Sequence, residues 1–262
     1  MEYTEEKPLR VVTLCSGYDS QCLALERLKR NFPDFGYELV NWAEFDPESS
    51  TPPERQPAVV AHNALFPQWA DRNLGDMTKI DWTVVPDFDL LFYSTPCQSV
   101  SQAGLQHGFT EGSGTRSSII WNVRDAVREK RPKYLCLENV KAMVSGKFVG
   151  MFNLWQAELE KFGYKNFARV LNAKDYGVPQ NRERIFLVSI LRTEGDPEPA
   201  YHFPKPFPLE TRLADVLEDE VDGRYFLSDD MLCRFCELST EEQEADDERD
   251  DGETDFEDML VM

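Results

Sequence analysis

The chain has 262 residues and a formal net charge of −20 at pH 7. That length allows one α/β domain with a full core, and the lack of a long apolar run excludes a transmembrane helix. Six cysteines without a disulfide-like spacing, and acidic residues close behind Met1 in place of a secretory signal, predict a reduced, cytoplasmic location.

Strand-like and helix-like segments alternate along the first part of the chain. A strand is expected over residues 9–14 and, after a turn at 16–20, a helix. The apolar face expected for that helix consists of Cys22, Leu23, Leu25 and Leu28. A second strand is expected over 37–44, and a short helix over 59–64 follows a proline-rich stretch. This order is typical of the start of a parallel α/β sheet.

The same alternation continues through the rest of the apolar sequence. The expected elements are a strand over 89–94, a helix over about 118–130, a strand that ends near Glu138, a helix over 148–162 and edge strands over 167–171 and 184–191. We therefore expect an α/β fold with a mostly parallel sheet and helices on both faces, within a catalytic domain over residues 1–200.

Three polar elements lie at the ends of these strands. Thr95-Pro96-Cys97-Gln98 follows one strand, Glu138-Asn139-Val140 ends the next, and Gln180-Asn181-Arg182-Glu183-Arg184 opens the last. Open α/β sheets bind ligands at the carboxyl ends of their strands. The sequence therefore places a nucleophile, a carboxyl group and a pair of arginines where a site would form.

These elements, in this order, resemble the Pro-Cys-Gln, Glu-Asn-Val and Gln-x-Arg-x-Arg motifs of the cytosine-5 DNA methyltransferase family. The resemblance extends over about residues 9–232. It implies the Rossmann-like fold of methyltransferases that use S-adenosylmethionine as cofactor. It also implies transfer of a methyl group to carbon 5 of a cytosine that is flipped out of double-stranded DNA.

The resemblance assigns catalytic roles to four residues. Cys97, as a thiolate, would add to carbon 6 of cytosine, and Glu138, its pKa raised by burial, would donate a proton at nitrogen 3. Arg184 would contact the base carbonyl, and Arg182 would support Cys97 or a phosphate. Alternatively, Cys97 is a buried structural cysteine and the two arginines are solvated bases. Residues that match family positions near the base, backbone and cofactor are Ser101, Arg116 and Ser118.

The turn after the first strand is expected to hold the cofactor through backbone N–H groups. Of the family's Phe-x-Gly-x-Gly-Gly turn only Gly17 remains, although Asp19 tolerates left-handed geometry. Glu44 would accept from the ribose hydroxyls, Phe45 would stack on adenine and Asp76 would accept from the adenine amino group; otherwise these acids are solvated surface. The expected cofactor residues are Cys15, Ser16, Gly17, Tyr18, Glu44, Phe45, Asp76, Met77, Pro96 and Ile119.

The C-terminal part of the sequence is strongly acidic. Residues 201–236 resemble the lead-in to the family's recognition region, and residues 237–262 carry 13 acidic side chains against Arg249 alone. We expect 237–262 to be a disordered, solvated tail or, alternatively, a docking or DNA-mimicking arm. Cys233 and Cys236 are expected to be unpaired thiols, and no metal is expected.

Two features of the family are missing from this sequence: a target-recognition domain and a late Gly-Asn-Ser-Val element. Because phosphate contacts dominate DNA affinity, an acidic chain is expected to need a separate subunit that reads DNA. We therefore expect the catalytic subunit of a split enzyme, with its acidic tail docked on the partner. The alternatives are a catalytically weak remnant that acts as an interaction or DNA-mimic protein, and an enzyme that acts on RNA.

Overall fold

The computed structural model describes residues 2–96 and 108–234 of the chain. Within them, six strands form one sheet in the order β2-β1-β3-β4-β6-β5. The strands are β1 (Leu9–Leu14), β2 (Tyr37–Ala43), β3 (Leu90–Tyr93), β4 (Tyr134–Val140), β5 (Tyr164–Asn172) and β6 (Glu183–Leu191). Each lies where an apolar run of the sequence predicts a strand.

The sheet is mostly parallel, as expected. β1 pairs in parallel with β2 and β3, and β3 pairs in parallel with β4, whereas β6 is antiparallel to both β4 and β5. An antiparallel strand begins at the edge where its neighbours end. Arg184, at the start of β6, therefore lies opposite Val140, at the end of β4. Strand β6 thus brings its polar start to the carboxyl edge of the sheet.

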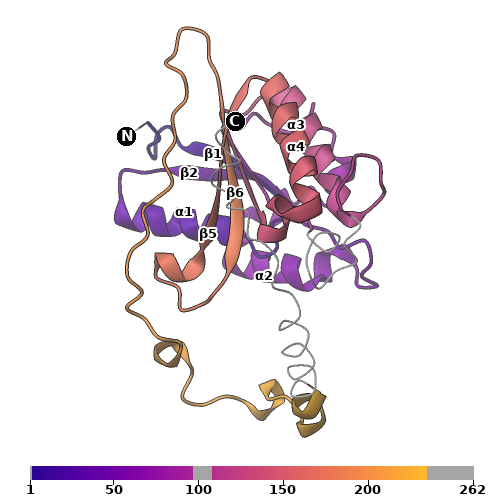
Figure 1. Cartoon of the computed structure of the whole chain (residues 1–262), viewed down its shortest axis with the longest axis vertical. Coiled ribbons are helices and arrows are strands. Elements are labelled where there is room, and N and C mark those ends of the chain that lie inside the picture. The colour runs from indigo at the N-terminus through magenta and orange to yellow at the C-terminus, as the bar shows by residue number, and fades with distance from the viewer. Residues whose placement is uncertain (1, 97–107, 235–262) are drawn as a thin grey trace.

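Helices cover both faces of the sheet, which confirms the expected architecture (Figure 1). The helices of one face are α1 (Ser20–Asn31) and α2 (Pro57–Leu65), and those of the other are α3 (Val123–Lys130) and α4 (Val149–Lys161). A cluster of buried apolar side chains lies on each face, with Trp42 and Trp155 as large, fully buried members. The strand ends therefore remain as the open edge of the fold.

Helix α1 has a narrower apolar face than the sequence predicts. Cys22 and Leu25 are buried against the sheet, but Leu23 and Leu28 are 36% and 37% exposed. The latter two lie roughly 100° to 120° around the helix from Cys22, on either side of the buried stripe. The expected helix over 118–130 also differs, because it begins with a 3-10 segment, Arg116–Asn122, before α3.

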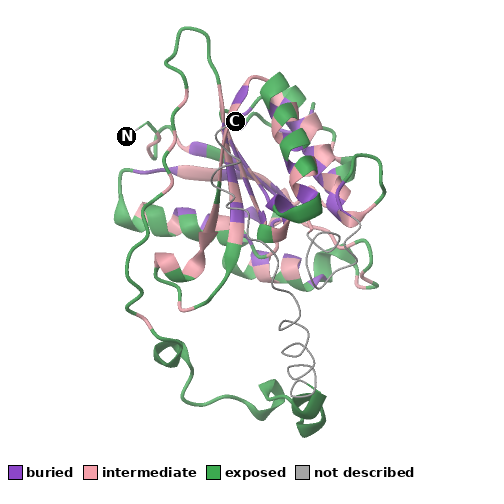
Figure 2. Ribbon diagram, viewed as in Figure 1, coloured by how far each residue is buried: buried purple, intermediate pink, exposed green. Residues whose placement is uncertain are grey.

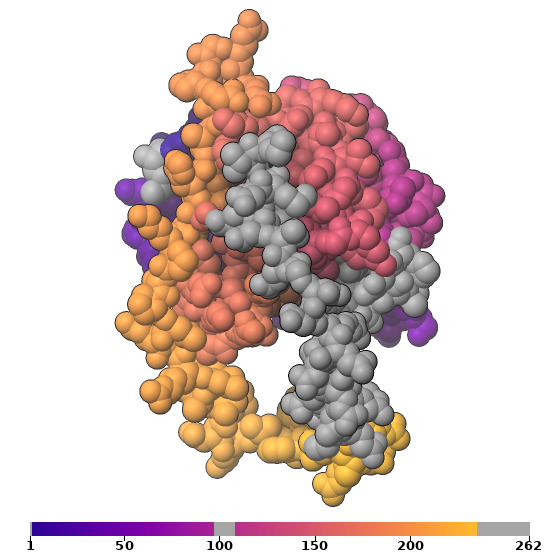
Figure 3. All heavy atoms as spheres, in the orientation of Figure 1, coloured from indigo at the N-terminus to yellow at the C-terminus, as the bar shows by residue number. Residues whose placement is uncertain are grey.

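The chain after β6 continues away from the sheet without adding a strand to it in the described residues (Figure 1). We call residues 209–232 the C-terminal arm, and Figures 2 and 3 show that it is exposed and projects from the α/β body. Its large apolar side chains, 42% to 71% exposed, are Leu209, Leu213, Val216, Leu217, Val221, Tyr225, Phe226, Leu227, Met231 and Leu232. The division into residues 1–200, 201–236 and 237–262 stays a prediction. Within the described ranges, no helix is long and apolar enough to cross a membrane.

Candidate functional site

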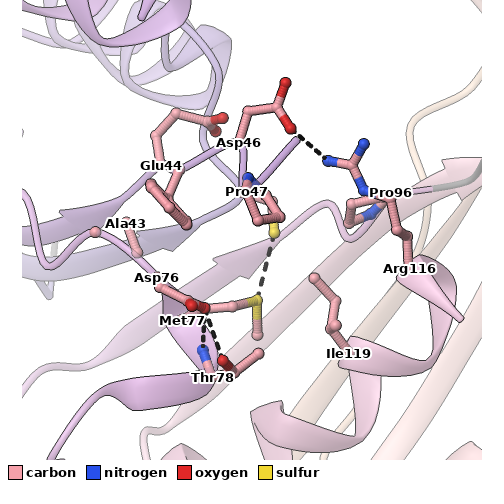
Figure 4. A pocket seen from close by; sticks show the side chains of 13 residues that line it. Ala43, Glu44, Asp46, Pro47, Asp76, Met77, Thr78, Pro96, Arg116 and Ile119 are labelled. Atoms are coloured by element: carbon pink, nitrogen blue, oxygen red, sulfur yellow. Dashed lines mark hydrogen bonds and ion pairs between the residues drawn. The ribbon is translucent and has the colours of Figure 1, made fainter. Parts of the chain in front are cut away.

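A cavity of about 350 Å³ lies at the carboxyl ends of β1, β2 and β3 (Figure 4). Its described lining consists of Cys15, Ala43, Glu44, Phe45, Asp46, Pro47, Gly75, Asp76, Met77, Thr78, Pro96, Arg116 and Ile119. Seven of the residues expected at the cofactor are therefore brought together. Parallel strands explain this, because their following loops all start at one edge of the sheet.

The turn between β1 and α1 has an unusual backbone. Cys15, Gly17 and Asp19 all adopt positive φ angles, of 51°, 57° and 66°. The left-handed geometry expected at Asp19 is therefore confirmed. The N–H of Gly17 donates to Oε2 of Glu44 at 2.7 Å, so the turn is joined directly to the end of β2.

Glu44 places a partly buried carboxylate at the cavity. Burial raises the pKa of Glu44 above its ordinary value, and the nearby charge of Asp46 acts in the same direction, while the hydrogen bond from Gly17 opposes them. Its backbone N–H donates to the side chain of Asn73 at 3.2 Å. The carboxylate is thus held in place by the two loops that flank it.

Two sulfur atoms form an apolar part of the cavity wall. The thiol of Cys15 donates to the thioether of Met77 at 3.4 Å. Burial raises the pKa of the Cys15 thiol to about 12, and Glu44 adds to the rise, so the group stays neutral at physiological pH. Cys15 therefore contributes a small apolar surface at the position of the phenylalanine in the Phe-x-Gly-x-Gly-Gly turn that the sequence resembles.

Asp76 lines the cavity beside these sulfur atoms, and its carboxylate already has several partners. It accepts from the N–H and the hydroxyl of Thr78, at 3.0 and 2.7 Å, and pairs with Lys79 at 3.0 Å. Burial alone would raise the pKa of Asp76, but the bonds from Thr78 and Lys79 outweigh it and lower the pKa. Asp76 is therefore a fixed carboxylate that retains acceptor capacity at the cavity.

Three expected cofactor residues lie outside the described lining. Ser16 is buried beneath the turn, with its hydroxyl 3.5 Å from the carbonyl oxygen of Ala43. Gly17 acts through its bond to Glu44, and the side chain of Tyr18 is 52% exposed. The physical reason is the left-handed turn, which directs successive residues to different sides.

The structure also adds Asp46 to the cavity, an acid that was not among the residues expected there, and it places beside it Arg116, which was expected near the base, backbone and cofactor. Arg116 donates to Asp46 at 3.1 Å and to Glu48 at 3.0 Å, and so connects the loop after β2 with the segment that precedes α3. The ion pair with Asp46 is visible in Figure 4. The position of Asp46, two residues after Glu44, is the local signal that could have identified it.

A second group of expected residues lies at the ends of β4 and β6. Nε of Arg184 is 3.2 Å from Oε1 of Glu138, and the two side chains are 22% and 31% exposed. The expectation that Glu138 is buried is therefore wrong, because its side chain is partly exposed at the strand end, where β6 supplies an arginine beside it. Arg182 is exposed, and its backbone N–H donates to the side chain of Asn172 at 3.1 Å.

Cys97 and Ser101 lie outside the described residues, but the backbone just before Cys97 is held on two sides. The amide of Asn139 donates to the carbonyl of Thr95 at 3.0 Å, and the hydroxyl of Ser117 donates to the carbonyl of Pro96 at 2.7 Å. Pro96 also lines the cavity. The cavity and the end of β4 are thus joined through the segment that leads to residue 97.

The cavity has the properties that an adenosine group requires. Its volume lies in the range of small-molecule sites, which combine apolar walls with a few placed polar groups. Phe45, Met77 and Ile119 offer apolar surface for a purine, and Glu44 and Asp76 offer carboxylates for hydroxyl and amino groups. The residues present therefore fit S-adenosylmethionine. Within the described residues, no cluster of three or more His, Cys, Asp or Glu side chains could hold a metal ion.

The sequence of this chain is similar to those of known methyltransferases. The chain is 41% identical over 162 residues to the type II methyltransferase M2.ScrFI of Lactococcus lactis subsp. cremoris, which covers 62% of this chain and 44% of that protein. It is 30% identical over 264 residues to the orphan methyltransferase M.Rho11sI of Bacillus phage rho11s, which covers 91% of this chain and 49% of that protein. The chain therefore spans about half the length of the curated relatives it matches.

Solved structures show a similar fold. A mutant of DNMT2 from Spodoptera frugiperda matches with a TM-score of 0.63 and 18% identity, over 84% of this chain and 62% of that one. The methyltransferase EhMeth of Entamoeba histolytica matches with a TM-score of 0.62 and 17% identity, over 86% and 64%. These likenesses confirm the Rossmann-like methyltransferase fold. The family model for C-5 cytosine-specific DNA methylases matches residues 9–253, and the chain belongs to this family.

Proposed function

We propose that this chain carries the catalytic half of an enzyme that transfers a methyl group from S-adenosylmethionine to carbon 5 of cytosine in double-stranded DNA. The observation that carries the proposal is a single edge of the sheet, where an adenosine-sized cavity lies next to the pair of Glu138 and Arg184. The segment that leads to Cys97 lies between them. A cofactor site, a nucleophile and a charged pair are the parts that this reaction needs.

The cavity would hold the cofactor through its carboxylates and apolar walls. Glu44 would accept from the ribose hydroxyls and Asp76 from the adenine amino group, while Phe45, Met77 and Ile119 would enclose the ring. When bound, the cofactor supplies an electrophilic methyl group on a sulfonium. The hydrogen bond between Gly17 and Glu44 keeps the acceptor carboxylate directed at the site.

The base would be activated by residues at the neighbouring strand ends. The thiolate of Cys97 forms a bond to carbon 6, and the displaced electron pair leaves carbon 5 as a nucleophilic enamine carbon. Glu138 supplies a proton at nitrogen 3 as negative charge reaches it. After methylation, carbon 5 loses its proton and the electron pair of that bond expels Cys97.

The spacing of Glu138 and Arg184 supports these roles. Nitrogen 3 and the carbonyl oxygen at position 2 of cytosine are separated by one ring carbon. Side chains that lie 3.2 Å apart can therefore contact both atoms together. Arg182 directly precedes β6 and stays a candidate for supporting Cys97 or a phosphate.

The charge of the chain supports a partner that reads DNA. The C-terminal arm contains eight acidic residues against two arginines and exposes a run of apolar side chains. A basic recognition polypeptide with an apolar patch is complementary to both features. We include this partner in the proposal, and we place the enzyme in the cytoplasm, where such a complex would reach DNA.

The arm's role can be tested with the part of M.Rho11sI that lies outside the region matched here as the probe. Its binding to this chain should weaken at least about tenfold when Tyr225 and Phe226 are both changed to Ser, since buried aromatic anchors dominate interfaces. Val84→Ser, an exposed apolar residue outside the arm, is the matched control. Equal affinities for all three proteins would contradict the docking role.

Transfer of tritiated methyl groups from S-adenosylmethionine to duplex DNA tests the activity itself. The assay compares the wild type with Cys97→Ala, with and without an added recognition half, and uses Cys233→Ala as the control for an exposed cysteine. Label that depends on Cys97 but not on Cys233 supports the proposal. Cofactor binding without transfer under any of these conditions would favour a remnant, and label in RNA alone would change the substrate.

A further inference from the structure

A buried polar cluster lies directly beneath the cofactor turn. Thr13 on β1, Asp19 at the start of α1 and His62 on α2 are each fully buried. The hydroxyl of Thr13 donates to Oδ2 of Asp19 at 2.8 Å, and Nε2 of His62 lies 3.5 Å from the same oxygen. Three elements of the fold therefore meet at one carboxylate.

The position of Asp19 at the first turn of α1 does not explain its side chain. An aspartate there normally accepts from the first backbone N–H groups of the helix. Among the described residues, Asp19 makes no such capping bond. Its carboxylate is turned into the protein instead, where it also neighbours the Cys22 thiol, whose pKa is raised first by burial and then by Asp19. The side chain thus acts inside the protein.

This arrangement is costly for the fold. A carboxylate without full hydrogen bonding is expensive to bury, and a left-handed residue at φ 66° favours glycine. Within the described part of the chain, Oδ1 of Asp19 and both ring nitrogens of His62 have no hydrogen-bond partner. The ring of His62 is held by stacking on Trp42, with centroids 3.6 Å apart. Costs of this kind are found where the strained residue has a function.

The cluster is connected to the cavity by two short steps. The N–H of Asp19 donates to the carbonyl of Ser16 at 2.8 Å, which closes the turn. The next residue, Gly17, donates to Glu44 at 2.7 Å, and Glu44 lines the cavity. A shift of Asp19 would therefore move the turn and the carboxylate that faces the ligand.

We infer that Asp19 is a positioning residue for S-adenosylmethionine, held by the hydrogen bond from Thr13 and packed beside His62, so that the turn and Glu44 keep their binding geometry. This inference rests on the proposed function. Glycine suits the left-handed backbone at this position best. The inference nevertheless implies that glycine would support cofactor binding less well than Asp19, because it removes the side chain that Thr13 holds.

The test measures S-adenosylmethionine binding to the full chain by calorimetry, with Asp19→Gly, Asp19→Asn and Arg131→Gly. Arg131 is a matched control, since it also has a left-handed backbone, at φ 46°, but lies at the end of α3. Asp19→Gly should weaken binding about tenfold, because it loses a charged hydrogen bond. Asp19→Asn, which still accepts from Thr13, should recover much of that loss, and Arg131→Gly should bind as the wild type does.

Kinetics then separate positioning from general instability. The KM for S-adenosylmethionine should rise in Asp19→Gly, while kcat at saturating cofactor stays near the wild-type value. Thr13→Val, which removes one anchor and keeps the side-chain shape, should raise KM in the same direction. Unchanged binding by Asp19→Gly and Thr13→Val, in a wild type that binds, would overturn the inference alone. A wild type that binds no cofactor would overturn the proposed function as well.

Discussion

The two ends of the carboxyl edge hold their charged groups in different ways. At the cofactor end, Glu44 is partly buried and receives a backbone N–H from Gly17. At the base end, Glu138 and Arg184 are partly exposed and hold each other. Backbone donors cannot leave, whereas a side-chain pair in contact with water can reorganise at small cost. Under the proposed function, the cofactor end is therefore preformed, and the base end can exchange its partner for a substrate.

The largest effect should come from breaking the base end alone. Glu138→Gln should lower kcat about 100-fold or more, because it removes a proton donor at nitrogen 3. Cofactor affinity and Tm should change little, since a partly exposed ion pair contributes at most about 1 kcal/mol. Glu183→Gln, which breaks the exposed pair between the first residue of β6 and Lys141 just after β4, is the control. A comparable loss of kcat in both variants would contradict a specific role of Glu138.

An intermediate effect should come from the preformed end. Glu44→Gln should weaken S-adenosylmethionine binding about tenfold, since it replaces a charged acceptor with a neutral one. Glu38→Gln, which lies on the strand that Glu44 follows but is paired with Arg72 away from the cavity, should bind normally. Calorimetry at fixed pH measures both. Equal affinities would mean that the carboxylate does not contact the cofactor.

The same residue predicts the pH dependence of binding. Because the pKa of Glu44 is raised by burial, its carboxylate is protonated earlier as the pH falls than an ordinary glutamate would be. Affinity should be highest above this raised pKa and should fall as the pH is lowered through it. Glu44→Gln should show a flat profile in that window. A wild-type profile that is equally flat would contradict the role of the ionised form.

The smallest effect should come from the ion pairs beside the cavity. Arg116→Met should weaken cofactor binding about threefold, and added salt should reproduce part of that loss in the wild type, because surface pairs are screened. Arg128→Met, which breaks an exposed pair with Asp125 on α3, is the control. If Arg116→Met binds the cofactor as tightly as the control does, the ion pairs of Arg116 do not contribute to cofactor binding.

The sequence was most informative where a local pattern decides the outcome. Apolar runs predicted every strand of the described sheet, and the position of Glu44 at the end of such a run, together with the family resemblance at Asp76, predicted the cavity that they line. Asp19 was expected to accept a left-handed backbone and does so. These features depend on a residue and its immediate neighbours, so one sequence contains the information.

Other features depended on residues that are distant in the sequence. Glu138 was expected to be buried, but its side chain is 31% exposed and the antiparallel β6 places Arg184 beside it. Arg116 lies 70 positions from its partner Asp46. Neither pairing follows from apolar periodicity, because periodicity does not give the direction of a strand or the path of a loop.

The sequence by itself determined the order of the elements and the chemistry at their ends: a cysteine and a carboxyl group where two buried strands end, and arginines where another strand begins. Strand formation is encoded in the nearest residues, and parallel strands present their ends at one edge. Only the tertiary structure decided which charges meet and which acids are buried, including the hydrogen bond from Thr13 to Asp19 beside His62. Those outcomes depend on strand order and packing, because a side chain's charge environment is made by neighbours from other elements.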